Sequence, residues 1–366
     1  MAAARLRAMP AVTVRIMHPE PAPGAGPLET WVATARAGLA RRHAERFTEA
    51  GAQDVGIVAG PPDGLAFGAR VRAMVAADRP AGLVLLGSGA IPLATMRDLR
   101  ELVTVAAADD RIALANNRYS ADVIAIARAG ATLGDLPDLP SDNALPRWLA
   151  EVAGYDIRDL RRRWRLAVDI DGPIDLILVG DAVATDAGGP DVYAPGVDRG
   201  PVLDRLAAVR AVARDPRAEL LVSGRTSAAT LTWLERSAAA RTRAVIEERG
   251  LRTSTPGQRP PASILGTLLE RDGPASLGSH LARLADAAIV DTRVLLAHRL
   301  GADEAGWPVA EDRFASDLLL AEGIADPWLR ELTVSAAAAA IPILLGGHTL
   351  VGPGVRLVVG RRMSTG

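Results

Sequence analysis

The chain contains no lysine and no cysteine. All 42 basic residues among its 366 positions are arginines. Without lysine there is no Schiff-base amine and no phosphate-binding ammonium group, and arginine cannot act as a base because it keeps its proton in proteins. Without cysteine there are no disulfides, thiolate metal ligands or cysteine nucleophiles, which fits a reducing compartment. A bound anion must therefore be held by guanidinium groups, backbone N–H groups or a metal ion.

Clustered positive charge and long apolar runs are also missing. The formal net charge is −1 and no basic block occurs, which argues against nucleic acid as the main partner. One of the longest apolar runs, Val334 to Leu345, is interrupted by Pro342 and is too short to span a bilayer. The N-terminus has no apolar core typical of a signal peptide. These features predict a soluble, cytoplasmic protein with no membrane partner.

The length favours more than one domain. A single hydrophobic core rarely serves 366 residues, and the 49% of hydrophobic residues can fill two cores. Apolar periodicity stops in a stretch rich in Asp, Gly and Pro. We therefore expect a first domain at residues 1–182, a linker at 183–200 and a second α/β domain at 201–366.

Strands and helices are predicted to alternate along the chain, which indicates an α/β fold with a doubly wound, mainly parallel sheet. In the first domain we expect strands at 12–17, 55–59, 82–86 and 112–115, and helices at 28–50, 67–77, 92–108, 145–151 and 157–163. In the second we expect strands at 219–222, 343–345 and 355–359, and helices that include 202–213 and a long one at 228–249.

Acidic residues interrupt an apolar run between Arg165 and Gly180. The run reaches Asp169 and Asp171, and Gly172-Pro173 then turns the chain into a helix. This segment resembles the Asp-Ile-Asp-Thr-Pro-Glu-Asp-Leu ending of nucleotidyltransferases with the nucleotide-diphospho-sugar transferase fold, such as the molybdenum-cofactor and 2-phospho-lactate guanylyltransferases. The resemblance covers about half of the chain, the N-terminal half. Capping of the following helix is the alternative explanation of the two aspartates.

The resemblance implies that a nucleotide binds at the first loop. Gly24 and Gly26 could bring backbone N–H groups close to a phosphate, and Arg36 or Arg41 on the next helix could supply positive charge. Several prolines remove donors from the same loop, so an ordinary connector is the alternative.

A second segment of the family carries a metal-binding Asp in the motif Gly-Asp-x-Pro-Leu. Here the matching turn reads Ser88-Gly89-Ala90 and has no carboxylate. Under the resemblance, Asp169 and Asp171 are the remaining candidates for catalysis and for holding Mg²⁺ or Mn²⁺. We expect weak or diverged metal-dependent chemistry.

Polar side chains follow another predicted strand, at Asn116, Asn117 and Arg118. Because ligands bind at the carboxyl ends of strands in open α/β sheets, we expect one pocket to be lined by these residues together with Ser88 and Asp171. Arg118, beside Tyr119, is the candidate ligand clamp and catalytic cation. A structural turn is the alternative.

The second domain offers two weaker sites. Arg225 and Thr226 follow a strand and could bind a phosphate or carboxylate, although capping of the next helix explains Thr226 equally well. His298 or His348, with Glu304, Glu311 or Asp312, could serve a metal or acid–base chemistry, and solvated helix faces are the alternative. Gly346-Gly347 before His348 indicates a tight turn or a close ligand.

Three functions stay open at this point. The first is a nucleotidyltransferase- or glycosyltransferase-like enzyme acting on a nucleotide-bearing or phosphorylated small molecule. The second is a non-catalytic sensor of such a ligand. The third is a subunit that only packs against a partner, and a homo-oligomer is left open as well.

Overall fold

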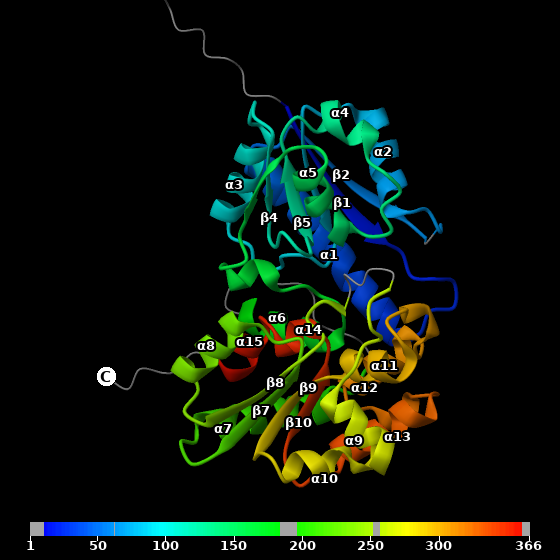
Figure 1. Cartoon of the computed structure of the whole chain (residues 1–366), viewed down its shortest axis with the longest axis vertical. Helices are drawn as coiled ribbons and strands as arrows, with labels where there is room; N and C mark the ends of the chain where they lie inside the picture. Colours follow the sequence, from blue (N-terminus) through cyan, green and yellow to red (C-terminus); the bar gives the residue numbers. More distant parts are fainter. Residues whose placement is uncertain (1–10, 62, 184–195, 252–256, 361–366) are drawn as a thin grey trace, which may run out of the picture. The chain divides into compact units, whose positions relative to one another are not determined.

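The computed structural model describes residues 11–61, 63–183, 196–251 and 257–360. They form two compact α/β units (Figure 1). The first comprises residues up to Ala22 and Arg36–Asp169, and the second comprises Pro23–Ala35 and the chain from Ile170 onward. The units differ from the expected domain ranges, because the first turns of one long helix and the segment 170–182 belong to the second unit. Most of the expected linker, residues 184–195, lies outside the described residues.

The first unit is built on a six-stranded sheet with the order β2-β1-β3-β5-β4-β6. All neighbouring pairs are parallel except those of β5, which runs antiparallel to β3 and β4. The expected mainly parallel sheet is thus confirmed. Its elements are β1 (Val12–Pro19), α1 (Pro27–Glu49), β2 (Asp54–Gly60), α2 (Phe67–Asp78), β3 (Gly82–Gly87), α3 (Met96–Ala106), β4 (Ile112–Ala115), β5 (Val123–Ile126), α4 (Ala129–Thr132), α5 (Leu145–Glu151) and β6 (Asp156–Asp159).

Helices cover both faces of this sheet because its central strands are apolar on both sides. Along β3, Val84 and Leu86 join one core with residues of α1 and α3. The alternate residues Leu83 and Leu85 join another core with residues of α2 and α5. Side chains alternate between the faces of a strand, so a continuous apolar run such as β3 supplies two cores at once.

The second unit contains a four-stranded sheet with the order β10-β9-β7-β8, and all its strands are parallel. Helices α7, α10, α12 and α13 contact its strands. Its elements are α6 (Pro173–Val183), α7 (Gly200–Arg214), β7 (Glu219–Gly224), α8 (Ala228–Ser237), β8 (Arg241–Ile246), α9 (Ile264–Asp272), α10 (Leu277–Ala282), β9 (Ala287–Asp291), α11 (Thr292–Leu300), α12 (Ala310–Asp317), α13 (Pro327–Ala337), β10 (Ile343–Gly346), α14 (His348–Val351) and α15 (Val355–Val359).

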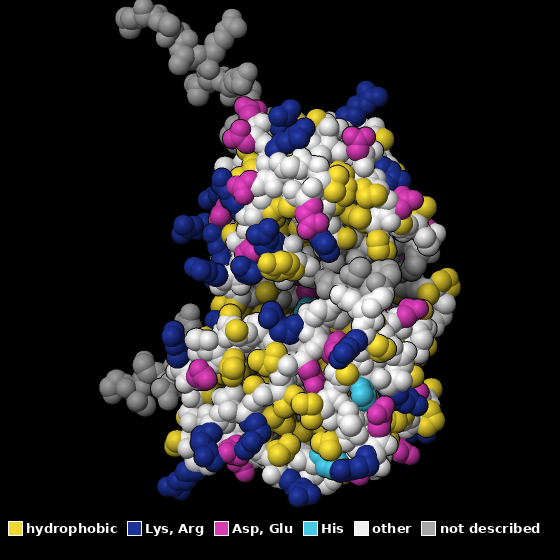
Figure 2. Space-filling model, viewed as in Figure 1, with side chains coloured by type: hydrophobic (Ala, Val, Ile, Leu, Met, Phe, Trp, Pro, Cys, Tyr) yellow, Lys and Arg dark blue, Asp and Glu magenta, His cyan; other side chains and the backbone are white. Residues whose placement is uncertain are grey.

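Three predicted elements are wrong. The long helix at 228–249 ends at Ser237, and Arg241–Ile246 is the edge strand β8, whose burial partly alternates from residue to residue. The segment at 157–163 begins as strand β6, whose Asp156–Asp159 pairs with β4. The terminal strand at 355–359 is helix α15, which packs on α7 and α6. In each case a short apolar or mixed run fits either period, and tertiary pairing decides. Among the described helices, none has the length and hydropathy needed to cross a bilayer. On the face seen in Figure 2, basic and acidic side chains are interspersed with hydrophobic ones.

Candidate functional site

Strands β1 and β3 bring two polar side chains together at the carboxyl edge of the first sheet. The strands are parallel neighbours, with Met17 opposite Gly87, so the next residues, His18 and Ser88, lie side by side. His18 Nδ1 and Ser88 Oγ share a hydrogen bond of 3.0 Å, and both residues are buried. Burial, followed by the positive charge of Arg36, lowers the pKa of His18. The sequence placed Ser88 at this edge, and the structure adds His18.

The turn after β3 is held by the backbone and by a buried histidine. Ile91 has a positive φ of 48°, and its N–H donates to the Val168 carbonyl at 3.2 Å. His43, on α1, donates from Nε2 to the Ala90 carbonyl at 2.9 Å, because a carbonyl can only accept. Burial lowers the pKa of His43 to about 4, so the ring is neutral near pH 7. Nothing in the sequence distinguishes His43 from other helical residues, because its role depends on a turn 47 positions away.

Asp169 lies beside the same turn. It forms an isolated antiparallel bridge with Ala90, which places the first aspartate of the resembled motif next to the Ser88–Ala90 turn. Among the described residues, no three His, Asp or Glu side chains gather closely enough to hold a metal ion. The Mg²⁺ or Mn²⁺ that the resemblance implies stays a prediction.

The two asparagines expected in the pocket serve their own loop. Asn116 is buried and donates to Asp122 Oδ2 at 2.8 Å and to the Leu166 carbonyl at 2.9 Å. Its own oxygen accepts from Asp122 N at 3.0 Å. Asn117 Oδ1 accepts from Tyr119 N at 3.0 Å, which is the geometry of an Asx turn. These contacts give the Asn116 amide and the Asn117 oxygen structural roles within the loop.

Arg118 lies at the surface of this loop. Its guanidinium carbon is 5.7 Å from the centroid of the Tyr119 ring, and Arg161 approaches the same ring at 5.7 Å. Tyr119 is 62% exposed. The loop thus presents an aromatic ring with two cations to solvent, a surface to which planar or anionic groups can bind. A cavity of about 680 Å³ in this unit lies elsewhere, between α2 and α4, where Arg72 and Gly130 line it.

The glycine-rich first loop already holds an anion, and the anion is a side chain of this chain. The Glu311 carboxylate accepts hydrogen bonds from the backbone N–H groups of Leu28 and Glu29 at 3.0–3.1 Å. Glu311 N donates in return to Glu29 Oε1 at 3.1 Å. A Cβ on Gly26 would lie 2.2 Å from the Glu311 side chain, and Gly24 has φ +85°. These two N–H groups at the start of α1 are therefore already bonded to Glu311.

Arg225 and Thr226 also bind within the protein. Arg225, at the carboxyl end of β7, makes a two-pronged contact with Asp291 at the end of β9, with Nε to Oδ2 at 2.7 Å and Nη2 to Oδ1 at 3.1 Å. The Arg225 side chain is 8% exposed and Asp291 is fully buried. Thr226 Oγ1 donates to the Val351 carbonyl at 2.8 Å. The fork expected to bind a ligand anion is therefore paired with a carboxylate of the neighbouring strand.

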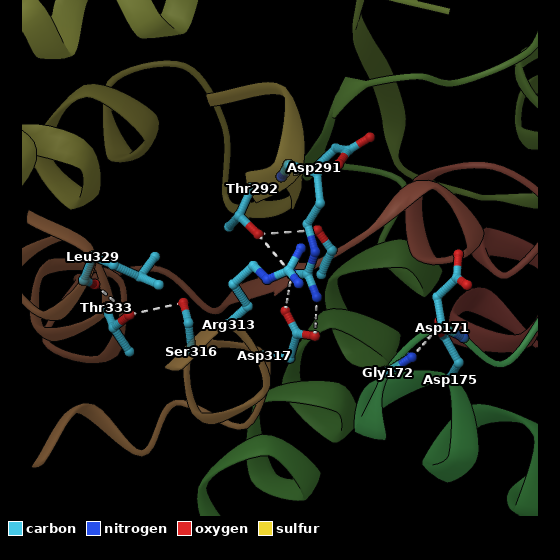
Figure 3. Close-up of polar contacts among 12 residues, drawn as sticks. Asp171, Gly172, Asp175, Asp291, Thr292, Arg313, Ser316, Asp317, Leu329 and Thr333 are labelled. Carbon is cyan, nitrogen blue, oxygen red and sulfur yellow. Dashed lines mark hydrogen bonds and ion pairs between the residues drawn. The ribbon is translucent and has the colours of Figure 1, made fainter. Parts of the chain in front are cut away.

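A second buried ion pair continues this network (Figure 3). Arg293 binds both oxygens of Asp317, one of them at 2.7 Å, and also donates to Thr292 Oγ1 at 2.9 Å. Burial is the largest single influence on the pKa of Asp291 and raises it, but the charge and hydrogen bond of Arg225 and the charge of Arg293 together help to make the net shift downward. For Asp317, burial outweighs the pairing with Arg293 and the pKa is raised. The charged side chains near the carboxyl edge of the second sheet are therefore mostly bound to one another as ion pairs.

Asp171 lies at this second edge. Its Oδ2 is 3.2 Å from Nδ1 of His348, the residue that follows Gly346-Gly347, and both side chains are about one quarter exposed. This pair can hold a proton on Nδ1 and present Nε2 of His348 as a proton acceptor. Asp171 and His348 were both candidates from the sequence, but they were assigned to separate sites.

Asp175, which the sequence did not single out, is buried next to Asp171. Its Oδ2 accepts from the backbone N–H groups of Asp171 and Gly172 at 3.0 Å each, so it caps the start of α6 (Figure 3). Its Oδ1 is buried without a hydrogen-bond partner in the described structure. Burial, and then the charges of Asp171 and Asp317, raise the pKa of Asp175 well above its usual value. The sequence carried one signal for Asp175: Pro173 predicts the start of a helix, and Asp175 lies in the first turn of that helix.

The other polar candidates of the second unit have structural partners. Glu304 pairs with Arg313 at 3.2 Å. Both oxygens of Asp312 accept from the backbone N–H groups of Ala325 and Asp326. His298 lies near Glu270 instead, with Nε2 and Oε1 3.3 Å apart.

No known protein-family model matches the chain, and no curated protein sequence matches it.

Proposed function

We propose that the protein binds a nucleotide-bearing or phosphorylated small molecule at the carboxyl edge of the first sheet, as a nucleotidyltransferase- or glycosyltransferase-like protein. The observation that carries the proposal is the junction of β1 and β3, where the hydrogen-bonded His18 and Ser88 lie within the positive field of Arg36. Ligands of open α/β sheets bind at such carboxyl edges. The resemblance of Asp169 and its neighbours to the nucleotidyltransferase motif points to the same edge.

In this proposal the charge that holds phosphate comes from arginines. Arg36 and Arg41 both act on the pKa of His18, so their charges lie close to this edge. Arg118 adds a surface guanidinium on the Tyr119 ring. Guanidinium groups bind phosphate oxygens in pairs, which suits a chain without lysine. His18 and Ser88 orient one another and supply hydrogen bonds to a bound ligand.

Catalysis would proceed by attack of an acceptor oxygen on a nucleotide phosphate, with pyrophosphate as the leaving group. Among the described residues, no three His, Asp or Glu side chains form a metal cluster at this edge. Removal of one transition-state donor typically slows an enzyme about 10²- to 10³-fold, and the turn at Ser88 lacks the carboxylate that the family carries. The proposed activity is therefore slow.

The alternative is a non-catalytic sensor of the same ligand. Two observations favour it. Position 88 is a serine and supplies no carboxylate for a metal ion, and Asn116 and Asn117 make hydrogen bonds within their own loop. Both leave fewer groups for catalysis, and neither closes the edge to a ligand. Sensor and enzyme share the ligand and differ in turnover.

The test has two readouts. Thermal shifts of the full chain are measured with nucleoside triphosphates and nucleotide sugars, with and without Mg²⁺ or Mn²⁺, because a ligand that binds the folded state raises its stability. Pyrophosphate release is then measured with phosphorylated acceptors. Arg36→Gln should weaken nucleotide binding about 10-fold or more, by loss of a charge-assisted contact. Arg147→Gln, at an exposed position on α5, is the matched control.

The outcomes separate the candidates. Binding with slow turnover that is lost in Asp169→Asn supports the enzyme, and binding without turnover supports the sensor. The proposal is overturned if no nucleotide or phosphorylated ligand shifts the melting temperature, or if Arg36→Gln and Arg147→Gln bind equally well.

A further inference from the structure

A small cavity in the second unit combines an apolar wall with three polar side chains. It measures about 260 Å³ and lies among α9, α11 and α13. The apolar wall includes Leu269, Leu295 and Trp328, and the polar side chains are Glu270, His298 and Arg299. The cavity belongs wholly to the second unit and shares no residue with the edge described above. Its volume is below the usual range for drug-sized ligands, so its occupant is small.

His298 lines this cavity and carries a buried ring N–H group. Its Nδ1 accepts from Ser263 N at 3.1 Å, so in the neutral ring the hydrogen is on Nε2. Nε2 is buried and has no hydrogen-bond partner among the described residues. Glu270 Oε1 is 3.3 Å away, but the geometry does not make a hydrogen bond. The side chain is only 11% exposed. Buried donors are nearly always paired, so this one calls for an acceptor.

The backbone of α9 is shaped to admit the imidazole ring. A Cβ on Gly266 would lie 2.3 Å from His298 Cδ2, closer than any real contact. Ser263, whose N–H holds Nδ1, is the N-cap of the same helix and accepts from Gly266 N at 3.0 Å. Helix α9 therefore fixes both the position and the tautomer of His298.

The cavity carries one charge of each sign. Glu270 is 61% exposed, and its carboxylate stands beside His298. The Arg299 guanidinium lies 5.1 Å from the centroid of the Trp328 ring and 4.0 Å from Asp326. A simple anion would satisfy His298 and Arg299 but would meet the Glu270 carboxylate. A simple cation would satisfy Glu270 but would leave the His298 N–H without an acceptor.

We propose that this cavity binds a free α-amino acid with an apolar side chain. The ligand carboxylate accepts from His298 Nε2 and from Arg299, the ammonium group binds Glu270, and the side chain packs on Leu269, Leu295 and Trp328. A zwitterion is the small molecule that matches all three polar groups at once. This site is independent of the nucleotide-binding proposal, and either can fail alone.

The binding test uses calorimetry on the full chain with three probes of one shape. L-leucine carries both charges, 3-methylbutylamine lacks the carboxylate and 4-methylpentanoate lacks the ammonium group. We expect L-leucine to bind and each one-charge analogue to bind at least 10-fold more weakly. Equal binding of L-leucine and either analogue would overturn the zwitterion assignment, and so would the absence of L-leucine binding at millimolar concentration.

Variants locate the ligand. Glu270→Gln and Arg299→Gln should each weaken L-leucine binding at least 10-fold. Arg271→Gln is the matched control, because Arg271 is an exposed neighbour on α9 that pairs with Asp272 and does not line the cavity. All these positions are at least one third exposed, so the variants should fold. L-leucine should also shift the His298 Nε2–H resonance, and an unchanged resonance at saturation would place the ligand elsewhere.

Discussion

The carboxyl edges of the two sheets differ in how they use charge. At the edge of the first sheet, His18 and Ser88 share a hydrogen bond, and the charges of Arg36 and Arg41 lower the pKa of His18. At the edge of the second sheet, Arg225 with Asp291 and Arg293 with Asp317 form buried ion pairs. The first edge is thus described by a hydrogen bond between two side chains, whereas at the second edge guanidinium groups pair with carboxylates of the same chain. Polar residues at the end of a strand therefore predict where a site could lie. Whether they can bind a ligand depends on which side chains they pair with in the folded protein.

The sharpest test of this difference breaks one buried pair of the second edge. Arg293→Met leaves the fully buried Asp317 without its partner, and loss of one member of a buried pair costs about 3–5 kcal/mol. The double variant Arg293→Met/Asp317→Leu should recover most of this loss, because no charge is then left unpaired. Chemical denaturation measures both. In the first unit, Arg147→Met removes an exposed pair with Glu151 and should cost less than about 1 kcal/mol. Similar losses for Arg293→Met and Arg147→Met would contradict the comparison.

The first edge should respond most strongly to pH. His43 has a folded-state pKa of about 4, below its ordinary value of 6.5, so its contribution is fully present above pH 6.5 and is lost as pH falls through 4. At about 1.4 kcal/mol per pKa unit, the loss is about 3 kcal/mol. Stability is measured by denaturation between pH 7 and pH 4 for the wild type and for His43→Leu. The variant should lack this part of the pH dependence, and an identical pH profile would refute the role of His43.

Asp175 should show the opposite pH dependence in the second unit. Its pKa is raised in the folded state, so its contribution is present at low pH and is lost as pH rises through the folded pKa. Asp175→Asn keeps an acceptor for the Asp171 and Gly172 N–H groups and carries no charge. It should stabilise the protein at pH 8 by about 1–2 kcal/mol and have little effect below the ordinary pKa of the carboxyl group. Destabilisation at pH 8 would show that the Asp175 charge is needed.

The smallest effect is expected at the first loop, where Glu311 caps the start of α1. Gly26→Ala pushes the Glu311 carboxylate away from the start of α1 and should cost about 1 kcal/mol, the usual value of a helix cap. Glu311→Gln serves as the control, because it keeps an acceptor but loses the charge and should cost less. Thermal denaturation distinguishes them, and a neutral Gly26→Ala would argue against the cap.

The success of sequence reasoning depended on the range of the interactions involved. Helix α1 and strand β3 were predicted nearly to their ends, because a 23-residue helix and a fully apolar strand carry a strong local pattern. Strand β8 was predicted as helix, because six residues of mixed character fit either period and only the pairing with β7 decides. Ser88 was placed at a strand end correctly, but its partner His18 could not be identified without the strand order.

Composition and local pattern alone determined that anions in this protein meet arginine rather than lysine, that strands alternate with helices, and that polar residues follow the strands. Each of these depends on residue chemistry or on neighbours within a few positions. The tertiary structure alone decided that Arg225 binds Asp291, that Glu311 caps α1, and that Asp171 lies beside His348. These partners are 66, 282 and 177 positions apart in the chain, as the residue numbers show. Only the order and register of the strands and the packing of the helices can bring such groups within hydrogen-bonding distance.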